Sequence, residues 1–116
     1  MSCLFNSLSR LIGEPPQQIR LKICDYLENN PALYEDLSAS LAIHIEKQLE
    51  LPAYIQQMRS PSTWGGAIEI RSFVNLWRRP VKVWAIRQKR WIEFPCENSI
   101  GPECKLSWSG GHYEPM

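Results

Sequence analysis

The sequence predicts an α+β fold in which helices pack on a mainly antiparallel sheet. Apolar residues recur at helical spacing as far as Trp77, whereas after Pro80 they recur with a period of two, which is typical of strands. The chain has 116 residues, of which 44% are apolar and 22% charged, as in an ordinary soluble domain. We therefore predict one domain over residues 1–116 with a single core.

Two helices are expected at the start of the chain. The first covers residues 3–12, with Ser2 as its N-cap and Gly13 as its stop. The second begins at Pro15-Pro16, because proline is favoured in a first helical turn, and ends at Asn29-Asn30-Pro31. Their apolar faces are Leu4, Phe5, Leu8, Leu11 and Ile12 in the first helix and Ile19, Ile23, Tyr26 and Leu27 in the second.

Three further helical segments follow. A third helix is expected over residues 35–49, where apolar residues stand at steps of four, and a short one over Ala53–Met58. Residues 63–66 are expected to form a cap and turn into a last helix, which ends at Arg78-Arg79-Pro80. The apolar faces are Leu37, Leu41, Ile45 and Leu49 in the third helix and Ile70, Phe73, Val74 and Trp77 in the last.

The final third of the chain predicts strands. Residues 81–86 are apolar on both faces because of Trp84 and Ile86, so this strand should lie centrally in the sheet. Arg87-Gln88-Lys89-Arg90 suits an exposed hairpin turn, and two more strands are expected around 92–94 and 106–108. Ser109-Gly110-Gly111 is a second turn, which places His112 at the start of a last short strand.

Charge and hydropathy argue against several classes of protein. Thirteen basic and twelve acidic side chains give a net charge of +1, which provides no global field for binding nucleic acid. No stretch approaches the roughly 20 apolar residues that a membrane span needs. No secretory signal is expected, since Arg10 falls inside the first helical pattern. We expect a monomer in the cytoplasm or nucleus, without membrane or nucleic-acid partners.

The positive charges are concentrated in residues 71–90, which hold seven cations and no acid. Such a run is typical of a solvated face, with some of the cations offsetting carbonyl dipoles at helix ends and turns. Docking to an acidic protein surface and binding to RNA are the two alternatives. The seven residues are Arg71, Arg78, Arg79, Lys82, Arg87, Lys89 and Arg90.

Four cysteines are expected to be free thiols, because a reducing compartment disfavours disulfides. Cys24 is interpreted as helix packing. Cys96 and Cys104 fall in the loop between strands, and their spacing matches no common zinc pattern, so we predict no metal site. Cys3 stands at a helix N-terminus, where free amide N–H groups and the helix dipole favour a thiolate, although core packing is the alternative.

The chain has two histidines. His44 falls inside the third predicted helix and is interpreted as structural or solvent-exposed. His112 follows a glycine-rich turn at a strand edge, where a sheet can hold an imidazole rigidly. His112 is therefore the stronger candidate for chemistry.

Three segments in order resemble the ovarian tumour (OTU) family of cysteine proteases: "CLFNSLS" at 3–9, "TWGGAIEIRSF" at 63–73 and "LSWSGGHYE" at 106–114. The likeness runs over nearly the whole chain. It implies a fold of the papain-like superfamily and a thiol-dependent deubiquitinase that needs no cofactor. The expected substrates are conjugates of ubiquitin or a ubiquitin-like protein, cleaved at the peptide or isopeptide bond after the C-terminal glycine.

The resemblance also implies roles for single residues. Cys3 takes the place of the nucleophile, His112 that of the general base, and Glu114 that of the residue that orients the imidazole. Relatives usually carry Asp or Asn at this third position, and glutamate is one methylene longer. Residues bordering the channel for the substrate's glycine tail correspond to Trp64, Gly65, Trp108, Gly110 and Gly111, although core or rim packing is the alternative for the tryptophans.

The start of the chain departs from the family pattern, which reads D-G-x-C where this chain has Met1-Ser2-Cys3. We interpret the chain as a member whose front loop is missing, either a fragment or a protein with a start codon assigned too late. In relatives the amides of this loop help to hold the oxyanion, and losing one donor costs ~10²–10³ in rate. Weak activity is expected, and the alternative is a module that binds ubiquitin or another protein without cleaving it.

Overall fold

The computed structural model describes residues 3–116, and in this part of the chain it contains five α-helices and two β-sheets. The prediction of Ser2 as an N-cap lies outside the described residues. The helices are α1 (Cys3–Ile12), α2 (Pro16–Glu28), α3 (Ala39–Lys47), α4 (Leu51–Met58) and α5 (Ala67–Trp77). The strands are β1 (Ala32–Tyr34), β2 (Leu37–Ser38), β3 (Val81–Ala85), β4 (Arg90–Phe94), β5 (Cys104–Trp108) and β6 (Tyr113–Pro115).

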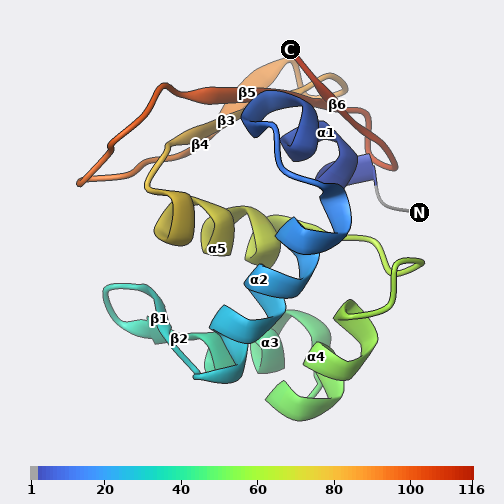
Figure 1. The fold of residues 1–116 in the computed structure, drawn as a ribbon, viewed down its shortest axis with the longest axis vertical. Coiled ribbons are helices and arrows are strands. Elements are labelled where there is room, and N and C mark those ends of the chain that lie inside the picture. The colour runs from blue at the N-terminus through green and yellow to red at the C-terminus, as the bar shows by residue number, and fades with distance from the viewer. Residues whose placement is uncertain (1–2) are drawn as a thin grey trace.

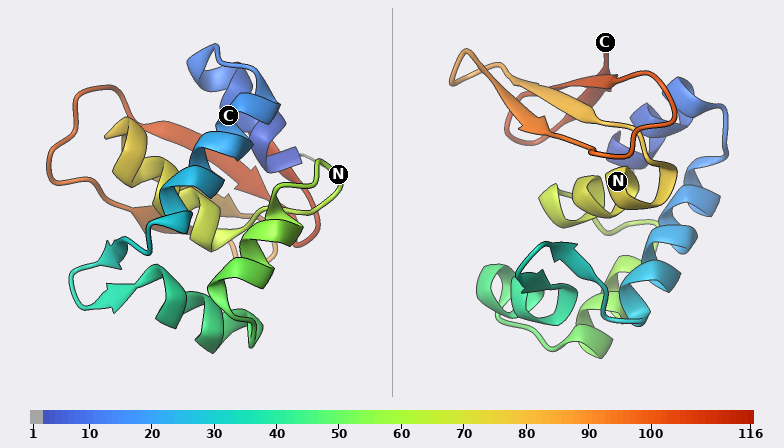
Figure 2. Two further views of the ribbon diagram at one scale, coloured as in Figure 1. Left: turned by 60° about the horizontal axis from the view of Figure 1, so that its bottom comes forward. Right: turned by 90° about the vertical axis from the view of Figure 1, so that its left-hand side faces the viewer.

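The elements form layers (Figure 1). The larger sheet lies at one end of the molecule, and α1 and α5 lie directly against it. Helix α2 leads away from the sheet to a second group made of α3, α4 and the β1–β2 hairpin. The right-hand view of Figure 2 shows the same order, with the sheet at the top and α3 and α4 farthest from it.

The larger sheet has the strand order β4-β3-β5-β6. Strand β3 lies inside the sheet, which confirms its expected central place. Two of the three pairings are antiparallel, but β3 and β5 run parallel, with Val83 opposite Leu106. Both of these side chains are buried against the helices. The mainly antiparallel sheet is therefore confirmed, and the parallel central pair is the feature that the sequence did not reveal.

Helices α1 and α2 match their predicted ranges because their apolar faces meet in the core. Phe5 and Leu8 of α1 and Ile19 and Ile23 of α2 are all fully buried. Burial of side chains of this size stabilises a fold by roughly 1.5–3 kcal/mol each. Gly13 ends α1 as expected, with φ of 78°, in the left-handed region that glycine tolerates.

The prediction of one helix over residues 35–49 is wrong in two respects. Leu37 belongs to the β1–β2 hairpin, and α3 begins only at Ala39. The expected apolar face also points outward, because Leu41 is 47% and Ile45 63% exposed. The residues that pack inward are Ala39, Ala42 and Ile43. These three residues belong to the hydrophobic core, so the inward face of α3 is offset from the one that steps of four predict.

Candidate functional site

Cys3 is the first residue of α1 and is half-buried. The next two side chains, Leu4 and Phe5, are fully buried and hold the beginning of the helix in the core. The first amide N–H groups of a helix have no partner within it, and they are available to an anion. The sequence thus places a cysteine on a rigid helix end, as predicted.

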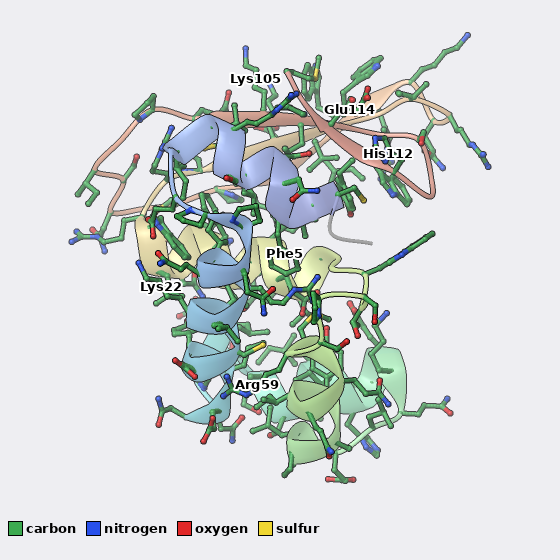
Figure 3. The ribbon with its side chains drawn as sticks, turned by 45° about the vertical axis from the view of Figure 1, so that its right-hand side comes forward. Phe5, Lys22, Arg59, Lys105, His112 and Glu114 are labelled. Carbon is green, nitrogen blue, oxygen red and sulfur yellow. The ribbon has the colours of Figure 1, made fainter. Side chains whose placement is uncertain are left out.

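Cys3 shares a cleft of about 520 Å³ with His112 and Glu114, and we call this hollow the histidine cleft. The cleft lies between α1 and the end of the chain, and Ser7 and Tyr113 also line it. Figure 3 shows Glu114 on β6 and His112 directly before this strand, near the beginning of α1. The structure therefore brings together the three residues that the resemblance singled out.

His112 and Glu114 lie side by side at the rim of the histidine cleft. The imidazole Nε2 of His112 and the carboxylate Oε1 of Glu114 are 3.5 Å apart, and the side chains are 53% and 67% exposed. Residues two apart on an extended strand point to the same side, which explains the pairing. With Nε2 turned to Glu114, the other ring nitrogen, Nδ1, is left for a second partner.

Backbone contacts join α1 to the segment that carries His112. The Ser7 hydroxyl lies 2.7 Å from the carbonyl oxygen of Cys3 and 3.2 Å from that of Tyr113, and it can donate to either. The Ser109 N–H donates to the His112 carbonyl oxygen at 3.0 Å, which closes the glycine turn. Burial, with a smaller contribution from nearby Cys3, raises the pKa of Tyr113 to about 12, so its phenol stays neutral at physiological pH.

A second cleft of about 480 Å³ lies on another side of Cys3, and we call it the tryptophan cleft. All five residues that the resemblance assigned to substrate binding line it. His112 and Glu114 line only the histidine cleft, whereas Cys3 and Tyr113 line both. The five residues are Trp64, Gly65, Trp108, Gly110 and Gly111.

Steric constraints explain why two positions at the tryptophan cleft are occupied by glycine. A Cβ atom on Gly65 would lie 2.8 Å from Leu4 Cδ2 and 3.0 Å from the Phe5 ring, so the backbone at 65 packs directly on α1. Gly110 has φ of 104°, a conformation that other residues rarely adopt. Across the tryptophan cleft, a Cβ on Gly111 would lie 4.0 Å from the Trp64 ring. The cleft is therefore narrow where Trp64 faces the glycine turn.

Two residues at the tryptophan cleft were missed in the sequence. Glu69 is fully buried, and its Oε1 accepts the Gly66 N–H at 2.7 Å while its Oε2 accepts the Tyr54 hydroxyl. Burial raises the pKa of Glu69, and these two hydrogen bonds oppose the shift. The signal for Glu69 was an acid three residues after a helix N-cap, the position from which it can bond the cap amide. Tyr54 carried no comparable signal.

The remaining cysteines are in other surroundings. Cys24 is fully buried, and burial raises the pKa of its thiol to about 11, which agrees with the packing interpretation. Cys104 was expected in a loop, but it is the buried first residue of β5, and burial raises its pKa. Cys96 is half-buried in the loop between β4 and β5. All four cysteines are free, and residues 3–116 hold no group of three side chains placed to bind a metal ion.

His44 is exposed on α3, with its Nδ1 atom 3.7 Å from the Glu50 carboxylate, as expected for a solvent contact. It lines neither cleft around Cys3. Among the described helices, none has the length and apolar content needed to span a membrane.

Several cations of the basic run at 71–90 have partners within the fold. Arg78 and Arg79 donate to the carbonyl oxygens of Asn98 and Pro102, and so hold the loop that leads into β5. Lys82 lies over the Trp91 ring, 4.8 Å from its centroid. These contacts support the interpretation of a structural and solvated face.

Comparison with known proteins places this arrangement in a family. The model of the family described as "OTU-like cysteine protease" matches residues 2–110. A Schizosaccharomyces pombe protein with the name "Putative ubiquitin thioesterase otu1" is 26% identical over 113 residues, which cover 97% of this chain and 32% of that protein. The chain thus spans about a third of the length of this relative.

Solved structures show the same fold. An ovarian tumour domain in complex with ubiquitin superposes with a TM-score of 0.80 at 22% identity, covering 98% of this chain and 62% of that one. The viral OTU domain protease from Dera Ghazi Khan virus gives a TM-score of 0.71 at 17% identity, covering 98% and 72%.

The family match includes Cys3 and ends before His112. The placement of His112 and Glu114 at the same cleft as Cys3 therefore rests on the structure. On the strength of the family match and the shared fold, the chain belongs to the OTU-like cysteine proteases.

Proposed function

We propose that this chain is a thiol-dependent deubiquitinase that hydrolyses the bond after the C-terminal glycine of ubiquitin or a ubiquitin-like protein. The observation that carries the proposal is the position of Cys3, which lines both the histidine cleft and the tryptophan cleft. A nucleophile needs a base on one side and a bound substrate on the other. The ubiquitin named with one structural relative supplies the substrate class.

In the proposed reaction His112 takes the thiol proton of Cys3 through Nδ1, and the sulfur attacks the carbonyl carbon of the terminal glycine. When the tetrahedral intermediate collapses, His112 gives this proton to the departing amine nitrogen, and a thioester remains on Cys3. Water then attacks the thioester as His112 accepts its proton. As the C–S bond breaks, His112 returns this proton to the Cys3 sulfur, and the new glycine carboxylic acid loses its own proton to solvent. Glu114 holds Nε2 of the ring throughout.

The tryptophan cleft suits an extended chain that ends in glycine. A Cβ atom on Gly111 would already lie in van der Waals contact with the Trp64 ring, at 4.0 Å. We infer that the space between them suits a glycine better than a residue with a side chain. Trp108 stacks on Tyr113, with ring centroids 6.3 Å apart, and forms a flat wall beside Cys3. Steric exclusion in a narrow channel gives specificity for the smallest residue.

A binding module without hydrolysis is the second candidate. The observation in its favour is that His112 and Glu114 are both more than half exposed at a separation of 3.5 Å. A solvated pair of this kind orients an imidazole weakly, because water competes for both partners. The tryptophan cleft would still bind a glycine tail.

A ubiquitin activity-based probe with a C-terminal electrophile separates the two candidates. We expect the chain to form a covalent adduct at Cys3, identified by mass spectrometry of the peptide that carries it. Reversible binding of ubiquitin without any adduct would support the binding module instead. A chain that shows neither a covalent adduct nor reversible binding of ubiquitin would contradict both candidates.

Replacing Glu114 by glutamine is expected to lower kcat/KM by less than about fivefold. The pair with His112 is exposed, and exposed pairs contribute about 0–1 kcal/mol, where 1.4 kcal/mol corresponds to a tenfold change in rate. Hydrolysis of a fluorogenic ubiquitin substrate gives the measurement. Glu93→Gln, at an exposed position on β4, is the matched control. A loss above about 100-fold would show that substrate binding buries this pair.

A further inference from the structure

Arg20 is a charged side chain with no exposure to solvent. It lies on α2, and its guanidinium faces the loop between α4 and α5. Nη1 donates to the carbonyl oxygen of Met58 at 2.8 Å, and Nη2 donates to those of Thr63 at 2.8 Å and Pro61 at 3.3 Å. A charge is buried only where polar partners compensate for its lost hydration. The compensation includes backbone carbonyl groups at the end of α4 and in the loop that follows it, and Nη1 also lies 3.5 Å from the Met58 sulfur.

The same guanidinium also contacts the helix that carries Cys3. Its central carbon lies 4.3 Å from the centroid of the Phe5 ring, a cation–π contact. Figure 3 shows Phe5 in the middle of the molecule, between α1 and the elements beneath it. The N–H groups of the Arg20 guanidinium therefore bind the backbone around the loop, and its flat face packs on Phe5 of α1.

The loop in question covers residues 59–66, and its second half, residues 63–66, lines the tryptophan cleft. Thr63, whose carbonyl Arg20 binds, directly precedes Trp64. At the far end of the loop, the Glu69 carboxylate binds the Gly66 N–H. Between these two buried anchors, the backbone at Gly65 packs on Leu4 and Phe5. The position of Trp64 relative to Cys3 is thus set by contacts on both sides.

We propose that Arg20 is a positioning residue that fixes the loop 59–66 and with it the Trp64 wall of the tryptophan cleft. Its effect on substrate binding rests on the proposed deubiquitinase function, whereas its effect on the loop does not. A lysine cannot replace it fully, because an ammonium group has no planar fork to span two carbonyl groups and no flat face for Phe5. Arg20 lines neither the histidine cleft nor the tryptophan cleft.

The test uses Arg20→Met and Arg20→Lys, with Lys22→Met as the matched control. Lys22 is a cation on the same helix, but it binds Glu14 at the surface and lines neither cleft around Cys3. Hydrogen exchange of the whole chain gives the first readout. In Arg20→Met we expect exchange of the amides in 59–66 to accelerate at least about tenfold, with α5 amides unchanged, and in Arg20→Lys a smaller acceleration in the same segment.

Kinetics with a fluorogenic ubiquitin substrate give the second readout. We expect KM to rise about tenfold in Arg20→Met with kcat within about threefold of the original value. The rate at which iodoacetamide alkylates the peptide containing Cys3 should not change. A residue that only stabilised the fold would lower kcat with the folded fraction and leave KM alone.

Three results would overturn the proposal: exchange that accelerates equally throughout the chain, a KM that stays the same when kcat falls, or global unfolding of both Arg20 variants. An original chain that neither binds nor cleaves ubiquitin would instead overturn the proposed function. Hydrogen exchange in 59–66 would then decide the role of Arg20 by itself.

Discussion

Replacing Cys3 by alanine is expected to abolish hydrolysis of a fluorogenic ubiquitin substrate, with a fall in kcat of about 10⁴-fold or more. The proposed reaction passes through a thioester, and alanine has no atom that can form it. Adducts with a ubiquitin probe should disappear as well. Because Cys3 is half-buried and alanine suits a first helical turn, the fold should be retained.

The matched control for Cys3→Ala is Cys96→Ala, at a half-buried cysteine outside both clefts. Its activity should equal that of the original chain. Affinity for ubiquitin should persist in Cys3→Ala, since the tryptophan cleft keeps all its other lining residues. Turnover that survives in Cys3→Ala would rule out thiol catalysis at this position.

Replacing His112 by alanine is expected to lower kcat/KM by about 10²–10⁴-fold, the usual contribution of a general acid and base. The Cys3 sulfur remains, but no group removes the proton from its thiol or supplies a proton to the leaving amine. The substitution should leave ubiquitin affinity unchanged, because His112 lines the histidine cleft and not the tryptophan cleft.

The chain offers a matched control for His112→Ala in its only other histidine, His44. His44 is exposed on α3, and its replacement by alanine should have no effect on kcat/KM or on probe labelling. Labelling of Cys3 by the probe should be slower in His112→Ala and should stay at the original rate in His44→Ala. Equal rates in the two variants would remove His112 from the mechanism.

Local structure could be predicted where side-chain spacing and stop residues agree. Helices α1 and α2 combine a clear apolar face with glycine or proline at their ends, and their ranges match the structure. In residues 35–49 the spacing was misleading, since Leu41 and Ile45 are exposed and Ala42 is buried. Contact between helices decided that segment, and such contact leaves no mark on a single stretch of sequence.

For the candidate site too, the sequence reveals some residues and not others. Cys3 and His112 could be found because short motifs surround them. Arg20 could not, since the carbonyl oxygens that it binds belong to the backbone 38 to 43 residues farther along the chain. The parallel pairing of β3 with β5 is a comparable case, because the loop before β5 is held by Arg78 and Arg79 through backbone oxygens. Every residue carries a backbone carbonyl group, so the sequence does not reveal which of them accepts a hydrogen bond.

The contact between Ser7 and Tyr113 joins positions that are 106 residues apart in the sequence. A ribosome adds about 5–20 residues per second, so roughly 5–20 s of synthesis separate α1 from the strand that follows His112. During that interval a nascent chain carries its thiol without its imidazole. Translation order would thus leave the proposed pair of Cys3 and His112 incomplete until the last strand has been made.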